Sequence, residues 1–149
     1  TWFDAQAHCE ARGGSLPTEA QWEFAARGED ELIYPWGNTY IAENVIGRDD
    51  PTYGSTRTAP VGSRPDGASW VGALDMSGNL WEWTLSEYRD YPYDANDGRN
   101  DNLDSTDVRR VLRGGGFYDN SSNLRAAYRG SWIPDLVINN RGFRCVRSY

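Results

Sequence analysis

Apolar residues near the start of the chain are spaced as in helices, and two short helices are predicted there. Residues 2–12 carry their apolar side chains at helical spacing, and a Gly-Gly pair at 13–14 ends the segment. Thr18 is followed three residues later by Gln21, which is the signature of an N-terminal capping box. A second helix is therefore expected to begin after Thr18 and to end at about Gly28.

Further along the chain, short apolar or alternating runs predict strands that are separated by polar loops. The stretches 34–69 and 88–107 show no persistent period, and sixteen Gly and seven Pro predict many turns. Irregular stretches of this length in a compact domain often carry function or hold an ion. The strands are expected at residues 58–62, 80–83, 109–113 and 142–147, with a further short element at 124–129.

The composition indicates one small acidic domain. The 149 residues carry a formal net charge of -7, and every basic residue other than His8 is Arg. An acidic chain is a poor candidate for binding a phosphate backbone, so nucleic acid is not an expected partner. No apolar run is long enough to span a membrane, and no secretory h-region is present. Because the chain begins at Thr1 rather than at Met, its localisation stays open.

Seven sequence strings, in this order, resemble the formylglycine-generating, sulfatase-modifying-factor family. They occupy residues 16–28, 34–38, 59–63, 75–84, 110–115, 124–129 and 142–147, and include Asp-Met-Ser-Gly-Asn-Leu-Trp-Glu-Trp-Thr and Gly-Phe-Arg-Cys-Val-Arg. The resemblance spans residues 1–149 as a single domain that lacks the first strands of the family's domain. It implies an α+β, C-type-lectin-like fold with two short helices, small twisted antiparallel sheets and much irregular loop.

The resemblance also bears on catalysis. Active members of the family bind copper through two cysteines shortly after the Arg-Gly-Gly turn, and Asp119 and Leu124 stand at those positions. Neither side chain supplies the soft thiolate that Cu(I) prefers, so no redox metal is expected and the chain is predicted to be a binding module. Two alternatives stay open. One is a metal-dependent oxidase or sulfoxide synthase completed by a missing domain, and the other is a regulatory module fused to a domain such as a kinase.

Calcium is the cofactor that the resemblance implies. Family members hold one ion with groups that correspond to the side chains of Asp75 and Glu82 and the carbonyls of Gly78 and Leu80. A second ion would use Asn44 and Val45 with an acidic partner. The alternative for the first set is that Asp75 caps its turn and Glu82 pairs with an arginine.

Two cysteines, Cys9 and Cys145, lie near opposite ends of the chain. From the residues alone they are either two free thiols or one bridge that closes nearly the whole chain. They match family positions that are bridged in members from oxidising compartments. The resemblance therefore implies that they lie close in space.

Between residues 116 and 141, aromatic, branched and Asn residues alternate with the family's strings. In a C-type-lectin-like fold these clusters are expected to gather on one face, which would bind a protein or other macromolecular ligand. The predicted ligand-binding residues are Phe117, Tyr118, Asp119, Asn120, Ser131, Trp132, Ile133, Leu136, Val137, Ile138, Asn139 and Asn140.

The same stretch resembles the variable proteins of diversity-generating retroelements, in which mutagenesis at template adenines turns Asn codons into a restricted set of residues. Phe, Tyr, Asp, Asn, Gly, Ser, Ile, Leu and Val belong to that set, and apart from Trp132 they make up the clusters. A second interpretation is an ordinary non-enzymatic family member whose loops have drifted. In a third, residues 136–138 form a core strand.

Overall fold

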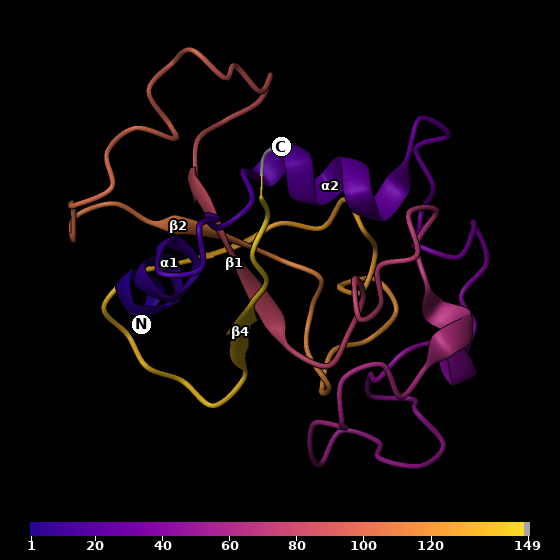
Figure 1. Ribbon diagram of the computed structural model, residues 1–149. Helices are drawn as coiled ribbons and strands as arrows, with labels where there is room; N and C mark the ends of the chain where they lie inside the picture. Colours follow the sequence, from indigo (N-terminus) through magenta and orange to yellow (C-terminus); the bar gives the residue numbers. More distant parts are fainter. Residues whose placement is uncertain (148–149) are drawn as a thin grey trace.

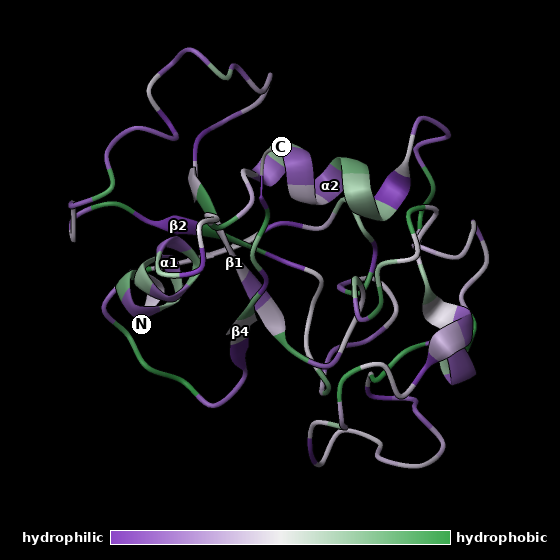
Figure 2. Cartoon of the chain, viewed as in Figure 1, coloured by the Kyte–Doolittle hydropathy of each residue, from purple (hydrophilic) through white to green (hydrophobic). Residues whose placement is uncertain are grey.

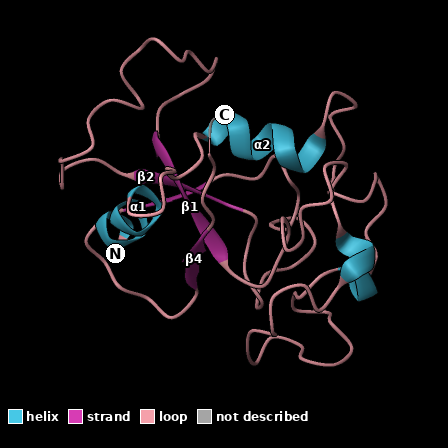
Figure 3. Cartoon of the chain, in the orientation of Figure 1, coloured by secondary structure: helices cyan, strands magenta, loops and turns pink. Residues whose placement is uncertain are grey.

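The computed structural model describes residues 1–147, in which two helices flank a small four-stranded sheet (Figure 1). Most of the remaining chain forms loops and turns (Figure 3). The elements are α1 (Trp2–Glu10), α2 (Glu19–Arg27), the 3-10 helices η1 (Ala42–Asn44) and η2 (Pro65–Gly67), and the strands β1 (Trp81–Glu87), β2 (Arg110–Arg113), β3 (Gly130–Trp132) and β4 (Arg141–Phe143). The predicted α+β class, with two short helices and much loop, is confirmed.

Both helices begin with the hydrogen bonds of a capping box. At α2, the hydroxyl of Thr18 accepts from the backbone N–H of Gln21, and the Gln21 side chain accepts from the N–H of Thr18. At α1, Thr1 and Asp4 make the same exchange. Gly28 ends α2 with a φ of 66°, as predicted. Each capping box gives hydrogen-bond partners to backbone N–H groups of the first turn, which would otherwise lack them. The boxes thereby stabilise the starts of helices that are only nine residues long.

The sheet is a single mixed sheet with the strand order β3-β2-β1-β4. β1 pairs antiparallel with β2, and β2 pairs antiparallel with β3. β4 pairs parallel with β1, because the chain leaves β3 at one edge and crosses to the other edge before it re-enters the sheet. The expectation of small antiparallel sheets is therefore wrong in this respect.

Three predicted elements differ in the structure. No strand forms at 58–62, because Ala59 exchanges both backbone hydrogen bonds with the side-chain amide of Asn79 instead of with a neighbouring strand. Residues 124–127 form turns, and residues 128–129 are in irregular structure before β3. The last predicted strand is shorter, since β4 ends at Phe143 and Val146 then forms an isolated antiparallel bridge with Ser15. The strands predicted at 80–83 and 109–113 are confirmed, and the first extends to Glu87.

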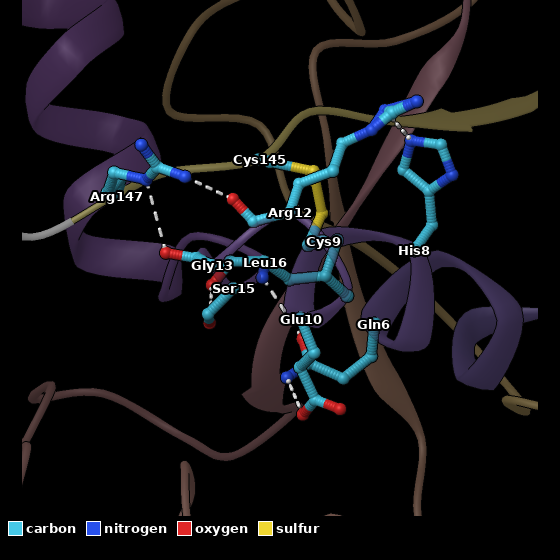
Figure 4. The surroundings of a disulfide bond; sticks show 10 residues. All are labelled: Gln6, His8, Cys9, Glu10, Arg12, Gly13, Ser15, Leu16, Cys145 and Arg147. Carbon is cyan, nitrogen blue, oxygen red and sulfur yellow. Dashed lines mark hydrogen bonds between the residues drawn. A yellow bond between two sulfur atoms is a disulfide. The ribbon is translucent and has the colours of Figure 1, made fainter.

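Small apolar clusters make up the core. The cluster under the sheet joins α1 to β1 through Trp2, Cys9 and Trp83. A bridge between Cys9 and Cys145 fastens α1 to the segment after β4, with a Cα–Cα distance of 5.4 Å. Next to it, Arg147 donates to the carbonyls of Arg12 and Gly13 (Figure 4). The proximity that the family resemblance implied for the two cysteines is thus confirmed.

No helix within residues 1–147 is long and apolar enough to cross a membrane.

Candidate ligand-binding face

Two loops and the end of the edge strand β3, which was expected to be a loop, meet at the sheet, and strand β1 holds them. Gly130 allows β3 to lie against the indole of Trp81, because a Cβ at this position would come within 2.7 Å of the ring. Trp81 donates its backbone N–H to the carbonyl of Asn140, which fixes the end of the loop before β4. Its indole N–H donates to the carboxylate of Asp119 in the loop after β2, at 2.9 Å. One buried tryptophan therefore contacts all three segments.

A continuous set of contacts joins the outer sides of these loops. The Asn140 side chain donates to the hydroxyl of Tyr118. The guanidinium of Arg141 donates to the Asn140 side chain and lies over the indole of Trp132, 5.4 Å from the ring centroid. The structure thus brings the three clusters together, and Tyr118 and Asn140 are in contact although 22 positions separate them in the sequence. We call the surface formed by residues 117–120, 131–133 and 136–140 the loop face.

Two further arginines attach to the loop face. The guanidinium carbon of Arg109 also lies over the indole of Trp132, 5.6 Å from the ring centroid. It also donates to the hydroxyl and the carbonyl of Ser131, at 3.0 and 2.8 Å. Arg48 donates from Nε to the carbonyl of Tyr118, at 3.2 Å. The sequence analysis did not name Arg48 and Arg109, because only the fold brings them to the loops, and it did not name Arg141, although this residue directly follows Asn140.

The loop face exposes apolar side chains. Val137 is 76% exposed, Ile133 44% and Trp132 37%. The apolar run of the third loop is visible as the green stretch that leads into β4 (Figure 2). Residues 136–138 also line a groove of about 310 Å³ together with α1 and Phe143. Exposed apolar side chains that gather on one face are typical of contact surfaces.

Asp119 is a correction to the predicted face. Its side chain is buried, and three donors occupy its carboxylate: the indole N–H of Trp81, the backbone N–H of Gly116 and the amide of Asn123, at 2.8–2.9 Å. Asp119 therefore holds the first loop instead of presenting a charge to a ligand. Leu124, the second position where active family members carry cysteine, is fully buried as well.

The other predicted ligand residues lie at or near the surface. Phe117, Tyr118 and Ser131 are partly buried, and so are Ile138 and Asn140. Asn120 and Asn139 are exposed, but Asn120 also accepts from the N–H of Ser122 at 3.0 Å and shapes its turn. Leu136 is 37% exposed.

The four residues predicted to hold a first calcium ion line one cavity of about 440 Å³. The turn is tightly specified: Gly78 has a φ of 78°, and a Cβ there would lie 2.3 Å from the carbonyl oxygen of Ile46. Asp75 uses Oδ2 to accept from the N–H of Gly62 at 2.7 Å. Leu80 lines the same cavity.

Glu82 already has a cationic partner in this cavity. Its carboxylate accepts from Nε and Nη2 of Arg144, at 2.6 and 2.8 Å, and from the indole of Trp22 at 2.8 Å. Burial alone would lower the pKa of the Arg144 guanidinium, but the charge and hydrogen bonds of Glu82 outweigh it and raise that pKa. The alternative in which Glu82 pairs with an arginine is thus present in the structure. Asp75 and the turn carbonyls remain as oxygen donors.

The second predicted ion set is adjacent in space. Ile46 and Gly78 form an isolated parallel bridge, so the segment that contains Val45 lies beside the first turn. The amide of Asn44 donates to the carbonyl of Asp66, and Val45 is buried. The nearby acidic residue Asp50 instead binds Arg64, with an Nε–Oδ2 distance of 2.9 Å. Within residues 1–147, no group of three or more His, Cys, Asp or Glu side chains is arranged to hold a metal ion.

A small mixed sheet, two capped helices and long loops fastened by side-chain hydrogen bonds define a formylglycine-generating-enzyme-like fold. The chain belongs to the family of sulfatase-modifying factor enzyme 1-like domains, whose profile matches residues 1–149.

Known proteins similar to this chain include both an inactive and an active type. It is 37% identical to the inactive C-alpha-formylglycine-generating enzyme 2 of Bos taurus, over 98% of this chain and 48% of that protein. It is 34% identical to the formylglycine-generating enzyme of Mycobacterium tuberculosis, over 96% of this chain and 54% of that protein. The chain thus spans about half the length of these curated relatives.

Among solved structures, the Treponema denticola variable protein 1 shares the fold. It superimposes with a TM-score of 0.70 at 24% sequence identity, over 87% of this chain and 46% of that protein.

Proposed function

We propose that this chain is a non-catalytic module that binds a protein or other macromolecular ligand through the loop face. The observation that carries the proposal is the contrast between exposed apolar side chains and a fixed framework directly beneath them. Val137 is 76% exposed, whereas Trp81, which holds the loops, is 7% exposed. Rigid aromatic groups beside adaptable Asn and Ser side chains are typical of binding surfaces.

The absence of catalysis is supported by the residues at the two cysteine positions. Asp119 and Leu124 are both buried and are engaged in the framework, and neither offers a thiolate. The identity to an inactive relative agrees with this proposal, although active enzymes are similar too. In the test, the intact protein is incubated with Cu(I), oxygen and a cysteine-containing peptide, with the Mycobacterium tuberculosis enzyme as positive control. No aldehyde is expected, and an aldehyde at the cysteine would overturn the proposal.

Binding is tested by selecting a random displayed peptide library against the intact protein. We expect most recovered peptides to lose binding when the loop face carries Trp132→Ala with Val137→Ser. The matched control is Trp70→Ala with Val61→Ser, which changes the same residue types at somewhat more exposed positions outside the face. Binding that is lost equally in both variants, or in neither, would show that the loop face is not the binding surface.

We also propose that the loop face is diversified at the level of the gene. The support is compositional: apart from Trp132, its clusters contain only residues of the set reachable from mutated Asn codons. The coding region is sequenced from many cells of one population. Dense substitution confined to residues 117–120, 130–133 and 136–140, at adenines of a template repeat, is expected. A uniform sequence there would mean that the loop face is not diversified, and the chain would then be a binding module of constant sequence.

Calcium is proposed as a structural cofactor, held by Asp75 and the carbonyls of Gly78 and Leu80. These groups are hard oxygen donors around one cavity, but the ion would have to share Glu82 with Arg144. Added Ca²⁺ is expected to raise the melting temperature relative to EDTA, and Asp75→Ala should remove the difference. Equal melting with and without the ion in the native sequence would exclude this cofactor.

A further inference from the structure

We infer that a pocket beside α2 binds a quaternary ammonium group, the cationic end of choline or of a trimethylated lysine. This inference goes beyond the proposed function, because none of the described residues that line the pocket belongs to the loop face. The pocket lies between α2 and the loop that follows β1, and it measures about 500 Å³. Sites for small ligands typically have volumes of about 300–1,000 Å³, so a group of this kind has room to enter.

Three aromatic side chains, Phe24, Tyr91 and Tyr93, line the pocket. Phe24 is 49% exposed and Tyr91 is 53% exposed, so both present ring surface to a ligand. The domain itself already places cations on the two tyrosines, with Arg129 at 4.5 Å from the centroid of Tyr91 and Arg99 at 4.5 Å from that of Tyr93. Neither arginine lines the pocket, so the parts of the rings that face it are parts that these guanidinium groups leave uncovered. Aromatic rings attract cations through their quadrupole.

The segments around the pocket carry a net negative charge. Residues 19–31 and 87–99, counted with the neighbouring Arg113, Arg125 and Arg129, contain nine carboxylates and six arginines. Five of these carboxylates form no ion pair within residues 1–147, namely Glu29, Asp30, Glu31, Asp90 and Asp94. A cation is therefore attracted to this side of the domain.

Arg27 lines the pocket as well, but its charge and its donors are already engaged. Nη1 donates to the carboxylate of Glu23 at 2.5 Å, and Nε and Nη2 donate to the carbonyls of Leu32 and Glu31 at 3.1 and 3.0 Å. The carboxylate of Glu31 also lines the pocket, is exposed, and accepts no hydrogen bond from the described part of the chain. Glu31 is thus the carboxylate that can face a bound cation.

The scarcity of free acceptors selects the kind of cation. Both oxygens of the second carboxylate in the pocket, that of Glu23, are engaged. Oε1 accepts from Arg27, and Oε2 accepts from Arg113 and Tyr91. A primary ammonium brings three N–H donors and a guanidinium five, and donors that stay unsatisfied weaken binding. A quaternary ammonium has no N–H, so ring surface and one nearby carboxylate are sufficient for it.

The first test titrates choline into the intact protein and follows the backbone amides by NMR. We expect the N–H signals of Gly28 and Ala127, which line the pocket, to shift. The neutral analogue of choline, in which carbon replaces the ammonium nitrogen, has the same shape and should bind about tenfold more weakly. Ethanolamine keeps the charge but adds N–H donors, and it should also bind more weakly than choline.

The second test changes the pocket. Phe24→Leu keeps an apolar side chain without a ring, and Glu31→Gln removes the free charge. Together they should weaken choline binding by about tenfold. The matched control is Phe143→Leu with Glu43→Gln, which changes the same residue types at exposed positions outside the pocket and should leave the affinity unchanged. If the double variant melts early, Glu31→Gln alone decides, with an expected loss of about twofold.

Several results would overturn the inference: equal binding of choline and its neutral analogue, no shift at Gly28 and Ala127, or equal weakening by the two double variants. The loop-face variant Trp132→Ala with Val137→Ser should bind choline normally, so the failure of either proposal leaves the other standing. A peptide with one trimethyllysine is then compared with free choline. Tighter binding of the peptide identifies a methylated protein as the source of the group, tighter binding of choline identifies a free small molecule, and both results support the inference.

Discussion

The same residue type serves opposite purposes in two regions of this domain. Along α2, Arg113 and Arg129 lie among the carboxylates of Glu19 and Glu23, and we call these four residues the α2 ion-pair cluster. Arg129 binds Glu19 through two nitrogens, at 2.5 and 2.9 Å, and Arg113 and Glu19 are almost completely buried. On the loop face, by contrast, Arg109 and Arg141 lie over the indole of Trp132 and form no ion pair with a carboxylate of residues 1–147.

The difference teaches how an acidic, loop-rich chain separates its framework from the proposed binding surface. A buried charge is costly unless it is paired, so each ion of the α2 ion-pair cluster fixes the position of its partners. Tyr88 and Tyr91 cover Arg129 further, with centroid distances of 4.4 and 4.5 Å. Exposed arginines carry no such constraint, and they can change partners when a ligand arrives.

The largest expected effect comes from breaking the α2 ion-pair cluster. Glu19→Gln keeps the size of the side chain but leaves Arg129 and Arg113 without their shared carboxylate. Removing one partner of a buried pair costs about 3–5 kcal/mol, and the free energy of unfolding should fall by that amount. Urea denaturation measures it, with the exposed Glu29→Gln as control. A change as small as that of the control would mean that the cluster is no part of the framework.

A smaller loss is expected at Asp119, which lies in a loop of the binding face but belongs to the framework. Asp119→Ala leaves the N–H groups of Trp81 and Gly116 and the amide of Asn123 without their acceptor. Unsatisfied buried donors cost about 1–3 kcal/mol, and urea denaturation should show a loss in this range. Asp135→Ala, at an exposed position of the neighbouring loop, is the control. If Asp119→Ala lost ligand binding but kept its stability, Asp119 would belong to the ligand-binding residues of the loop face and not to the framework.

Local sequence signals predicted both helices, whereas one predicted strand does not form because a distant side chain takes its backbone hydrogen bonds. Thr18 and Gln21 are three residues apart, so the capping box depends on neighbours that the sequence itself shows. The strand expected at 58–62 fails because Asn79, twenty residues away, offers its side-chain amide to Ala59. Likewise, the parallel pairing of β4 depends on where the chain re-enters the sheet, which no local pattern records.

The candidate site, too, could be predicted only in part from the sequence. Residue types between 116 and 141 were enough to predict the aromatic and branched clusters of the loop face. Sequence reasoning could not distinguish the buried Asp119 from its exposed neighbour Asn120, because the difference arises from Trp81, thirty-eight residues away. Arg48 was missed for the same reason, since it is seventy residues from Tyr118.

The smallest effect on stability is expected for Val137→Ser. Val111→Ser makes the same substitution at a buried valine and serves as the comparison. Val137→Ser changes a side chain that is 76% exposed, so the free energy of unfolding should stay within about 0.5 kcal/mol of the native value. Val111→Ser in β2 places a hydroxyl in a fully buried position and should cost about 1–3 kcal/mol. Equal losses in urea denaturation would make residues 136–138 part of the core, as a buried strand would be. A loss confined to Val111, together with weaker binding of selected peptides by Val137→Ser, places the energetic role of Val137 in the complex with the ligand.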